Sequence, residues 1–240
     1  MGIDVGEKLI CKSLEFDGVN DFALGSNTNN EYDFIDYNLP FTISVAFQYK
    51  TIGSWLISTY NASTTPQGWA LYAQNPTTIR FSFYFDSLTI RNFQAASIPS
   101  LIADNWYFLT YIYDGSGEGS NSKWYINGQY YSSLGGTVTF SVITSNNVEI
   151  ARRGSVANLN MNSVRLWDTN LTDEQALQEY NNGFGRLKPV LPDNCKLDLN
   201  MSKSVWDGSQ FLIKDQSNNV SDFQTFNMGE TQLINGCYQI

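Results

Sequence analysis

Acid–base chemistry in this chain of 240 residues falls to carboxylates, tyrosines and lysines, because the sequence contains no histidine. The lack of an imidazole excludes Ser-His-Asp and Cys-His activation of a nucleophile, and every histidine-ligated metal site. The strand candidates considered for catalysis carry no pair of acidic residues: Arg80 and Asp86 are the charged residues of one, and Glu149 stands alone between Val148 and Ile150. Asp173 and Glu174 fit the solvated first turn of a helix. We therefore expect that the protein is not an enzyme.

Aromatic side chains offer a second kind of chemistry, the binding of sugars. Aromatic faces contact the C–H groups of sugar rings, and nearby Asn and Gln amides can hydrogen-bond the hydroxyls. The candidates for this role are Trp55, Trp69, Tyr72, Tyr84, Trp124, Tyr130 and Tyr131. Core packing is the commoner role of any one such side chain. Tyr130 and Tyr131 are adjacent, so a strand would point them to opposite faces. We predict glycan contacts at Trp55, Trp69, Tyr72, Trp124 and Tyr130.

The three cysteines, Cys11, Cys195 and Cys237, are odd in number and far apart, and no CxxC occurs. A zinc site is therefore not expected. Two alternatives remain open. The cysteines are free, partly buried thiols, or Cys195 and Cys237 form a bridge that brackets the C-terminal segment.

The charge balance argues against several partners. The formal net charge is −9 and the sequence pI is about 4.4. Arg152 and Arg153 form the densest basic spot, so a nucleic-acid groove is not expected. No apolar run is long enough to cross a membrane, and residues 1–11 lack the apolar core of a signal peptide. We expect neither nucleic acid nor membrane insertion.

The elements that must position these residues are mostly strands. Apolar residues alternate with polar ones in residues 41–49 and 79–85, which predicts two half-buried strands. Residues 106–113 are almost continuously apolar, as in a central strand. Asn127-Gly128 lies between two apolar runs and predicts a type I′ hairpin turn. Further short strands are predicted at 148–151 and 164–167.

One helix interrupts this pattern. Thr172 can cap it, Gln175 occupies the capping-box position, and Gly183 or Gly185 would end it. A helix of this length is marginal alone and must dock on another surface. Many short strands and one helix together indicate an antiparallel β-sandwich.

The pattern of apolar and polar residues changes after residue 185. Pro189 and Pro192 mark a linker or an extended crossing segment. Short strands are predicted at 195–199, 211–214, 223–228 and 237–240. We divide the chain into a main domain, 1–185, and a C-terminal extension, 186–240. The extension is too short for a core of its own, so we expect it to pack on the main domain or on a neighbouring subunit.

Five motifs, taken in order, resemble the laminin G-like modules of the concanavalin A-like lectin/glucanase superfamily. They are residues 14–22 (LEFDGVNDF), 41–44 (FTIS), 106–109 with 113–115 (WYFL, YDG), 125–128 (YING) and 164–168 with 171–174 (VRLWD, LTDE). The resemblance covers about residues 9–185. It implies an all-β, concanavalin A-like jelly-roll sandwich of two antiparallel sheets with one short helix, here followed by the extension. Phe16, Phe22 and Trp167 would be core residues, and Asp17-Gly18 a turn.

Residues 197–199 and 214–219 resemble the stretch that normally precedes such a module. They either begin a shortened second module or complete a sheet edge of the first in a permuted sense. We favour the second reading, because no module-length chain follows.

The family resemblance also bears on metals and hydrolysis. Many relatives bind calcium at a sheet edge, and Asp17, Asn20 and Asp21 offer suitable oxygen ligands. A turn held by Asx hydrogen bonds explains the same residues equally well. The glucanase branch uses two glutamates in an E-x-D-x-x-E string, which this sequence lacks, so a laminarinase-like hydrolase is disfavoured.

For function, we predict a structural or adhesive virion protein of a bacteriophage: a head decoration, head fibre or tail component. Its partners would be other virion proteins or identical subunits, with a host surface glycan as a further ligand. The alternative is a carbohydrate-binding module or adhesin of a bacterium, at the cell surface or secreted. Apolar residues of the extension would serve assembly, namely Trp206, Phe211, Ile213 and Phe223.

Overall fold

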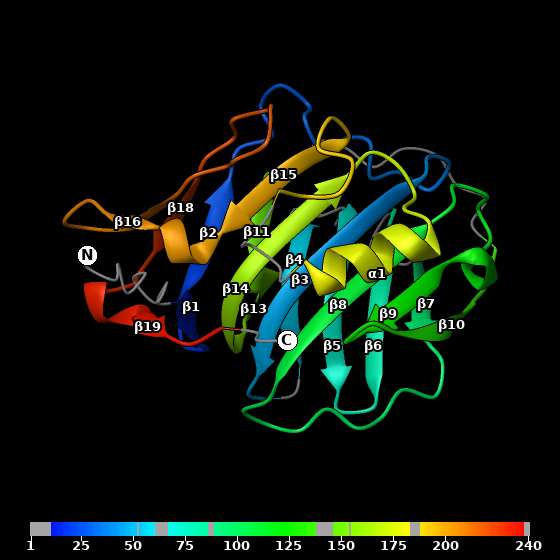
Figure 1. Ribbon diagram of the computed structural model, residues 1–240, viewed down its shortest axis with the longest axis horizontal. Helices are drawn as coiled ribbons and strands as arrows, with labels where there is room; N and C mark the ends of the chain where they lie inside the picture. The colour runs from blue at the N-terminus through cyan, green and yellow to red at the C-terminus, as the bar shows by residue number, and fades with distance from the viewer. Residues whose placement is uncertain are drawn as a thin grey trace, which may run out of the picture.

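A computed structural model describes residues 11–51, 53–60, 67–85, 89–137, 146–153, 155–182 and 188–237. Strands dominate, and they form two layers packed face to face (Figure 1). The sequence-based prediction of an all-β sandwich with one short helix is confirmed. No helix in the described ranges is long and apolar enough to cross a membrane.

The layer nearer the viewer in Figure 1, sheet A, is antiparallel throughout. Its order is β19 (Leu233–Asn235), β1 (Lys12–Asp17), β14 (Asn158–Trp167), β3 (Phe41–Tyr49), β8 (Trp106–Tyr113), β9 (Lys123–Ile126) and β10 (Gln129–Gly135). Strand β14 pairs with β1 over residues 158–161 and, on the same side, with β15 (Cys195–Asn200) over residues 163–167.

The second layer, sheet B, is also antiparallel. Its order is β16 (Val205–Trp206), β17 (Phe211–Ile213), β18 (Phe223–Phe226), β2 (Phe22–Gly25), β11 (Val148–Ile150), β4 (Ser54–Tyr60), β5 (Gly68–Asn75), β6 (Thr78–Tyr84), β7 (Ile90–Ala95) and the end of β10. Strand β10 pairs first with β9 and then with β7, so it joins the two sheets. A separate hairpin is formed by β12 (Arg152–Arg153) and β13 (Ser155–Val156).

Aromatic rings fill the space between the sheets. The Phe81 ring stacks on Tyr111 with centroids 4.8 Å apart, and Phe41 lies 5.3 Å from Phe81. The alternation of β3 and β6 points these rings inward. Phe16 is also interior, as predicted. Phe22 is not a core residue: it points outward from β2, half-buried, and stacks on Phe226 at 4.8 Å.

Strand β3 differs from its prediction as a half-buried strand. Thr42, Ser44 and Ala46, on the polar side of its alternation, are fully buried, and Ser44 and Thr110 share a 2.8 Å hydrogen bond. The reason is that helix α1 (Asp173–Asn181) lies across the outer face of sheet A (Figure 1). Small polar side chains there leave room for the helix, which a single-strand pattern does not reveal.

The helix begins as predicted. The Thr172 hydroxyl accepts a hydrogen bond from the Gln175 amide, and the Gln175 side chain accepts from the Thr172 amide. The Tyr180 ring packs edge-on against Phe108 at 5.6 Å. Trp167 is fully buried beneath this cover, on the outer face and not between the sheets, and its indole Nε1 donates to the Val190 carbonyl at 2.7 Å. Gly183 and Gly185, the predicted end of the helix, lie outside the described residues.

The hairpin between β9 and β10 turns as predicted. Asn127 and Gly128 have φ angles of 51° and 75°, which a type I′ turn requires. A Cβ atom on Gly128 would lie 2.7 Å from the Tyr180 ring. Glycine is therefore needed both for the turn and for the approach of the helix.

The C-terminal extension completes both sheets of the same sandwich. Strand β15 joins sheet A beside β14, and β18 joins sheet B beside β2. Its apolar side chains belong to the chain's own core: Phe211, Ile213 and Phe223 are at most 1% exposed. Half-buried Trp206 packs on Phe211 at 5.0 Å. Of the two alternatives drawn from the sequence, the extension packs on the main domain. The predicted assembly role of Phe211, Ile213 and Phe223 is wrong, because these side chains are buried in the core of the chain's own sandwich. An assembly role for Trp206 stays a prediction. Of the predicted strand 237–240, only Cys237 is described.

The cysteine pairing corrects both alternatives drawn from the sequence. Cys11 and Cys237 form a disulfide with their Cα atoms 5.7 Å apart. Cys195 is a free, buried thiol that donates to the Leu197 carbonyl at 3.2 Å. The pairing of β1 with β19 brings the two ends of the described chain together, and sequence spacing carries no information on that contact.

Candidate functional site

Outward-pointing aromatic residues gather on the outer face of sheet B. Trp55 lies opposite Tyr72 in the pairing of β4 with β5, with ring centroids 4.5 Å apart. Tyr84, from β6, completes a group around Ala70. We call Trp55, Tyr72 and Tyr84 the Trp55 cluster. In the described residues no helix covers this face, unlike the outer face of sheet A.

A strand irregularity brings Trp55 to this face. The pairing of β4 with β5 shifts register between Trp55 and Ile57. Ile57 points to the interior, and regular alternation would point Trp55 inward as well. With Leu56 as the extra residue, Trp55 instead shares a face with Tyr72. The bulge therefore converts a core position into a surface position.

Polar side chains surround the cluster on the neighbouring strands. Arg80 Nε donates to Gln94 Oε1 at 3.1 Å. The Ser82 hydroxyl donates to the exposed Asn92 at 2.6 Å and lies 3.3 Å from the Tyr72 hydroxyl. Guanidinium, amide and hydroxyl groups next to aromatic faces are suited to a ligand that carries both C–H faces and hydroxyls.

Arg153 lies over the cluster. Its guanidinium carbon is 3.5 Å from the Tyr84 ring centroid and 4.9 Å from that of Trp55. The β12–β13 hairpin holds it there, because Trp55 Nε1 donates to the Ser155 hydroxyl at 3.2 Å. Burial raises the pKa of Tyr84 to about 12, so its phenol is neutral at physiological pH. The cluster thus carries positive charge over neutral rings.

The face continues beyond the hairpin. The Arg152 guanidinium lies 4.0 Å from the Phe22 ring centroid, and its Nε is 3.7 Å from the Glu149 carboxylate. Burial raises the pKa of Glu149 above its usual range. An open groove of about 470 Å³ lies here, between the β1–β2 turn and the hairpin, with Phe22 and Arg152 in its lining. Aromatic and cationic groups therefore extend over several strands.

The structure divides the five predicted glycan residues among three places. Trp55, which is half-buried, and Tyr72, which is 8% exposed, lie together in the Trp55 cluster. Trp69 and Trp124 are at most 1% exposed between the sheets, so their predicted sugar contacts are wrong. Their positions in β5 and β9 point them inward, and the indole of Trp124 donates to Ser133 at 3.2 Å. Tyr130 is 48% exposed on the other side of the molecule and packs against Tyr125 at 5.6 Å.

The predicted calcium ligands form a turn. Asp17 Oδ1 accepts from the Val19 amide at 2.7 Å, and Asp21 Oδ2 accepts from the Asp17 amide at 3.1 Å. The Asn20 carbonyl accepts from Asn227 at 2.9 Å. Burial raises the pKa of Asp21. Asp21 Oδ1 is buried and accepts no hydrogen bond from the described residues.

Calcium needs six to eight oxygen ligands. The described residues contain no group of three or more acidic, Cys or His side chains placed to hold a metal. The Asx turn accounts for the contacts of Asp17, while calcium binding at Asp17, Asn20 and Asp21 stays a prediction.

Comparison with known proteins identifies a family with this architecture. A family model described as the concanavalin A-like lectin/glucanases superfamily matches residues 19–176. No curated protein matches the chain.

Solved structures share the fold at low identity. A Bacteroides ovatus protein described as a "putative carbohydrate binding protein" has a TM-score of 0.59 and 15% identity, over 92% of this chain. This chain spans 59% of the length of that protein. A SAP-like pentraxin of Limulus polyphemus has a TM-score of 0.54 and 11% identity, over 90% of this chain and 100% of its own. The CBM40 of a Ruminococcus gnavus IT-sialidase has a TM-score of 0.52 and 14% identity, over 70% of this chain and 95% of its own.

Proposed function

Because the chain belongs to the concanavalin A-like lectin/glucanase superfamily, we propose that it is a non-enzymatic carbohydrate-binding module whose ligand lies against the Trp55 cluster. One observation carries the proposal: Trp55, Tyr72 and Tyr84 meet on a sheet face that no described helix covers, beside Arg80, Asn92 and Gln94. Core packing alone does not require outward aromatic rings.

Arg153 has a defined part in this proposal. A sugar ring that stacks on Tyr84 must take the place of the guanidinium over that ring. Displaced from Tyr84, Arg153 can donate hydrogen bonds to the sugar's hydroxyl or acidic groups. Arg80 and Gln94 would meet the ligand on the other side of Tyr72, since Arg80 pairs with both residues across β5, β6 and β7.

The fold neighbours support the class of ligand. One is described as a carbohydrate binding protein, and the R. gnavus CBM40 has a structure bound to α2,3-sialyllactose. Their identity to this chain is 14–15%, so they support a sugar ligand by analogy of fold and not residue by residue.

For the biological setting, we propose a virion protein of a bacteriophage, with a bacterial adhesin or carbohydrate-binding module as the alternative. The Cys11–Cys237 disulfide supports a location outside a reducing cytosol, which suits both settings. Capsid and portal genes beside this gene would favour the virion. A neighbourhood of polysaccharide-use genes would favour the bacterial alternative.

A glycan array followed by calorimetry tests the binding proposal. We expect Trp55→Ala and Tyr72→Ala to weaken binding of any array hit about ten-fold or more, equivalent to about 1.4 kcal/mol. Tyr130→Ala is the matched control, because Tyr130 is also an exposed aromatic residue but lies on the other side of the molecule. If Tyr130→Ala removes binding and Trp55→Ala does not, the site is beside α1 and the proposal is wrong.

A reducing-sugar assay tests the non-enzymatic part. The purified protein should release no sugar from β-glucans, xylan or peptidoglycan above a blank. Release that disappears on substitution of one acidic residue would show that the protein is a hydrolase.

A further inference from the structure

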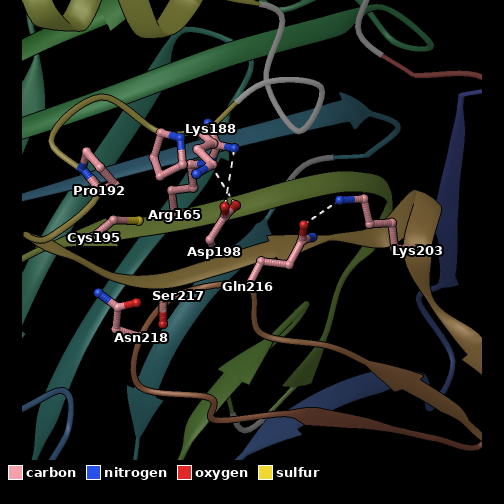
Figure 2. A pocket seen from close by; sticks show the side chains of 10 residues that line it. Arg165, Lys188, Pro192, Cys195, Asp198, Lys203, Gln216, Ser217 and Asn218 are labelled. Atoms are coloured by element: carbon pink, nitrogen blue, oxygen red, sulfur yellow. Dashed lines mark hydrogen bonds and ion pairs between the residues drawn. The ribbon is translucent and has the colours of Figure 1, made fainter.

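A polar cavity of about 350 Å³ lies on the outer face of sheet A, on the opposite side of the sandwich from the Trp55 cluster. Side chains from β14, β15 and three connecting segments line it (Figure 2). The connecting segments are the stretch from Lys188 to Pro192, the 3-10 helix Met201–Lys203, and the loop from Gln216 to Asn218. All but β14 belong to the C-terminal extension, so the extension builds a cavity as well as a sheet edge.

The floor of the cavity is a buried ionic group. Arg165 Nε donates to Asp198 Oδ1 at 2.7 Å, and the Arg165 guanidinium also pairs with Glu179 of α1. The Arg165 side chain is 2% exposed. Asp198 is the one acidic residue in the lining, and its carboxylate is already matched by Arg165. The floor is therefore held in place, and its carboxylate is not free to bind a cation.

The rim is cationic. Lys203 and Lys188 come from different segments and stand on opposite sides of the cavity in Figure 2. Lys203 Nζ donates to Gln216, and exposed Lys188 forms no ion pair with another described residue. Asp198 and Glu179 compensate the charge of Arg165, so the uncompensated positive charge of the lining comes from Lys188 and Lys203, in a chain with 14 basic and 23 acidic residues. This local reversal of sign favours an anionic ligand.

The remaining lining adds hydrogen-bonding groups. The Gln216 and Asn218 amides each offer donors and an acceptor. A volume of about 350 Å³ is at the small end of ligand pockets. A bare inorganic anion would satisfy the lysines but would leave these amides without a ligand contact. A small acid that also carries hydroxyls would satisfy both.

We propose that this cavity binds a polyhydroxylated acid the size of one sugar, such as a hexuronic acid. The two lysines of the rim, Lys188 and Lys203, attract its carboxylate, and its hydroxyls face Gln216 and Asn218. The site is separate from the Trp55 cluster, and its ligand does not depend on binding there.

Titration of the full chain with sodium glucuronate and galacturonate, followed by NMR or calorimetry, tests this proposal. Glucose is the neutral control of matched size. We expect at least one uronate to bind about ten-fold more tightly than glucose, since each charged contact is worth about that factor or more. Its affinity should fall as sodium chloride is raised. A linear triuronate distinguishes two forms of the ligand, and both agree with the proposal. If the triuronate binds as tightly as the free uronate, the cavity takes the end of a polysaccharide chain. If the triuronate does not bind, the cavity takes only the free acid.

Variants locate the ligand. Lys188→Gln and Lys203→Gln should each weaken uronate binding about ten-fold. Lys214→Gln is the matched control, because Lys214 is exposed and pairs with Asp222 away from the cavity. Trp55→Ala should leave uronate binding unchanged, so failure of this site and failure of the proposed function give different results.

Four results would overturn the proposal. Three are the absence of uronate binding, equal binding of glucose, and binding that neither lysine substitution changes. The fourth is sulfate binding as tight as that of the uronate, which would show a simple anion site instead.

Discussion

Each outer face of the sandwich carries an outward-pointing tryptophan, and the two side chains differ in how far they are buried. On sheet A, Trp167 is fully buried under the segment that follows α1, with its indole bonded to Val190. On sheet B, Trp55 is half-buried beneath the side chain of Arg153. Both residues occupy strand positions that face away from the core. The cover decides whether such a ring stabilises the fold or remains available to a ligand.

The cover on sheet A is built from specific contacts. Arg165 joins β14 to Glu179 of the helix, and the Val190 amide donates to the same glutamate at 3.0 Å. The cover on sheet B is a two-stranded hairpin that contacts the cluster through Arg153 and Ser155. The first arrangement is a second small core, and the second leaves polar groups at the surface.

The largest expected effect is at Trp167. Trp167→Ala should lower the free energy of unfolding by about 3–5 kcal/mol, because it leaves a cavity under the helix and an unbonded Val190 carbonyl. Chemical denaturation followed by circular dichroism measures this. A loss below about 1 kcal/mol would mean that Trp167 contributes no more to stability than a partly exposed ring such as Trp55.

Trp55→Ala should cost much less stability, about 1 kcal/mol, since it removes a partly exposed ring and a cation–π contact. The same variant should weaken glycan binding about ten-fold or more. The same denaturation experiment compares it with Trp167→Ala. If the two substitutions cost equally, Trp55 is a structural residue and the contrast between the faces does not hold.

The helix cap comes next. Thr172→Ala should cost about 1 kcal/mol by removing the hydrogen bond to the Gln175 amide. Thr172→Ser retains the hydroxyl and is the control, with an expected change of a few tenths of a kcal/mol. A neutral Thr172→Ala would show that packing alone holds the helix on sheet A.

The smallest effect concerns pH. The hydrogen bond from Lys123 lowers the pKa of Asp173 below its usual range. A lowered pKa means that this pair stabilises the protein above the ordinary aspartate pKa and ceases to do so as pH falls through the lowered value. Because both side chains are exposed, the contribution should be about 0.2–1 kcal/mol.

Comparison of Lys123→Gln with the wild type from neutral to acidic pH measures the Asp173 contribution. The difference in unfolding free energy should shrink as Asp173 becomes protonated. A difference that persists at low pH would assign the effect to Lys123 packing and not to the ion pair.

Much of the fold could be predicted from local signals. Period-two alternation located β3 and β6, Asn127-Gly128 located the β9–β10 hairpin, and Thr172 with Gln175 located the start of α1. These signals succeed because they depend on residues close in the chain. Strands β4, β5 and β7 were missed although each has six to eight residues. Register shifts interrupt the alternation of β4 and β5. The short strands β16 and β19 were also missed, since two or three residues carry too little pattern.

The candidate site was only partly predictable. Composition identified the aromatic residues but not the sheet face that each one occupies. Tyr72 and Trp69 point to opposite faces because they are three residues apart in β5, and Trp55 shares the face of Tyr72 because of the bulge in β4. The bulge leaves no mark in the sequence. Arg153 stood out as part of the densest basic spot, yet its place over Tyr84 depends on the hairpin.

The sequence by itself therefore determined the residue types that can do chemistry, the absence of histidine, the strand periods and the family. Only the tertiary structure decided which rings point away from the core, that Cys11 pairs with Cys237, and that the extension closes both sheets and lines the cavity at Arg165. The physical reason is distance along the chain. Propensity and periodicity act between neighbours, whereas these features arise where β1 meets β19, β14 meets β15 and β4 meets β5.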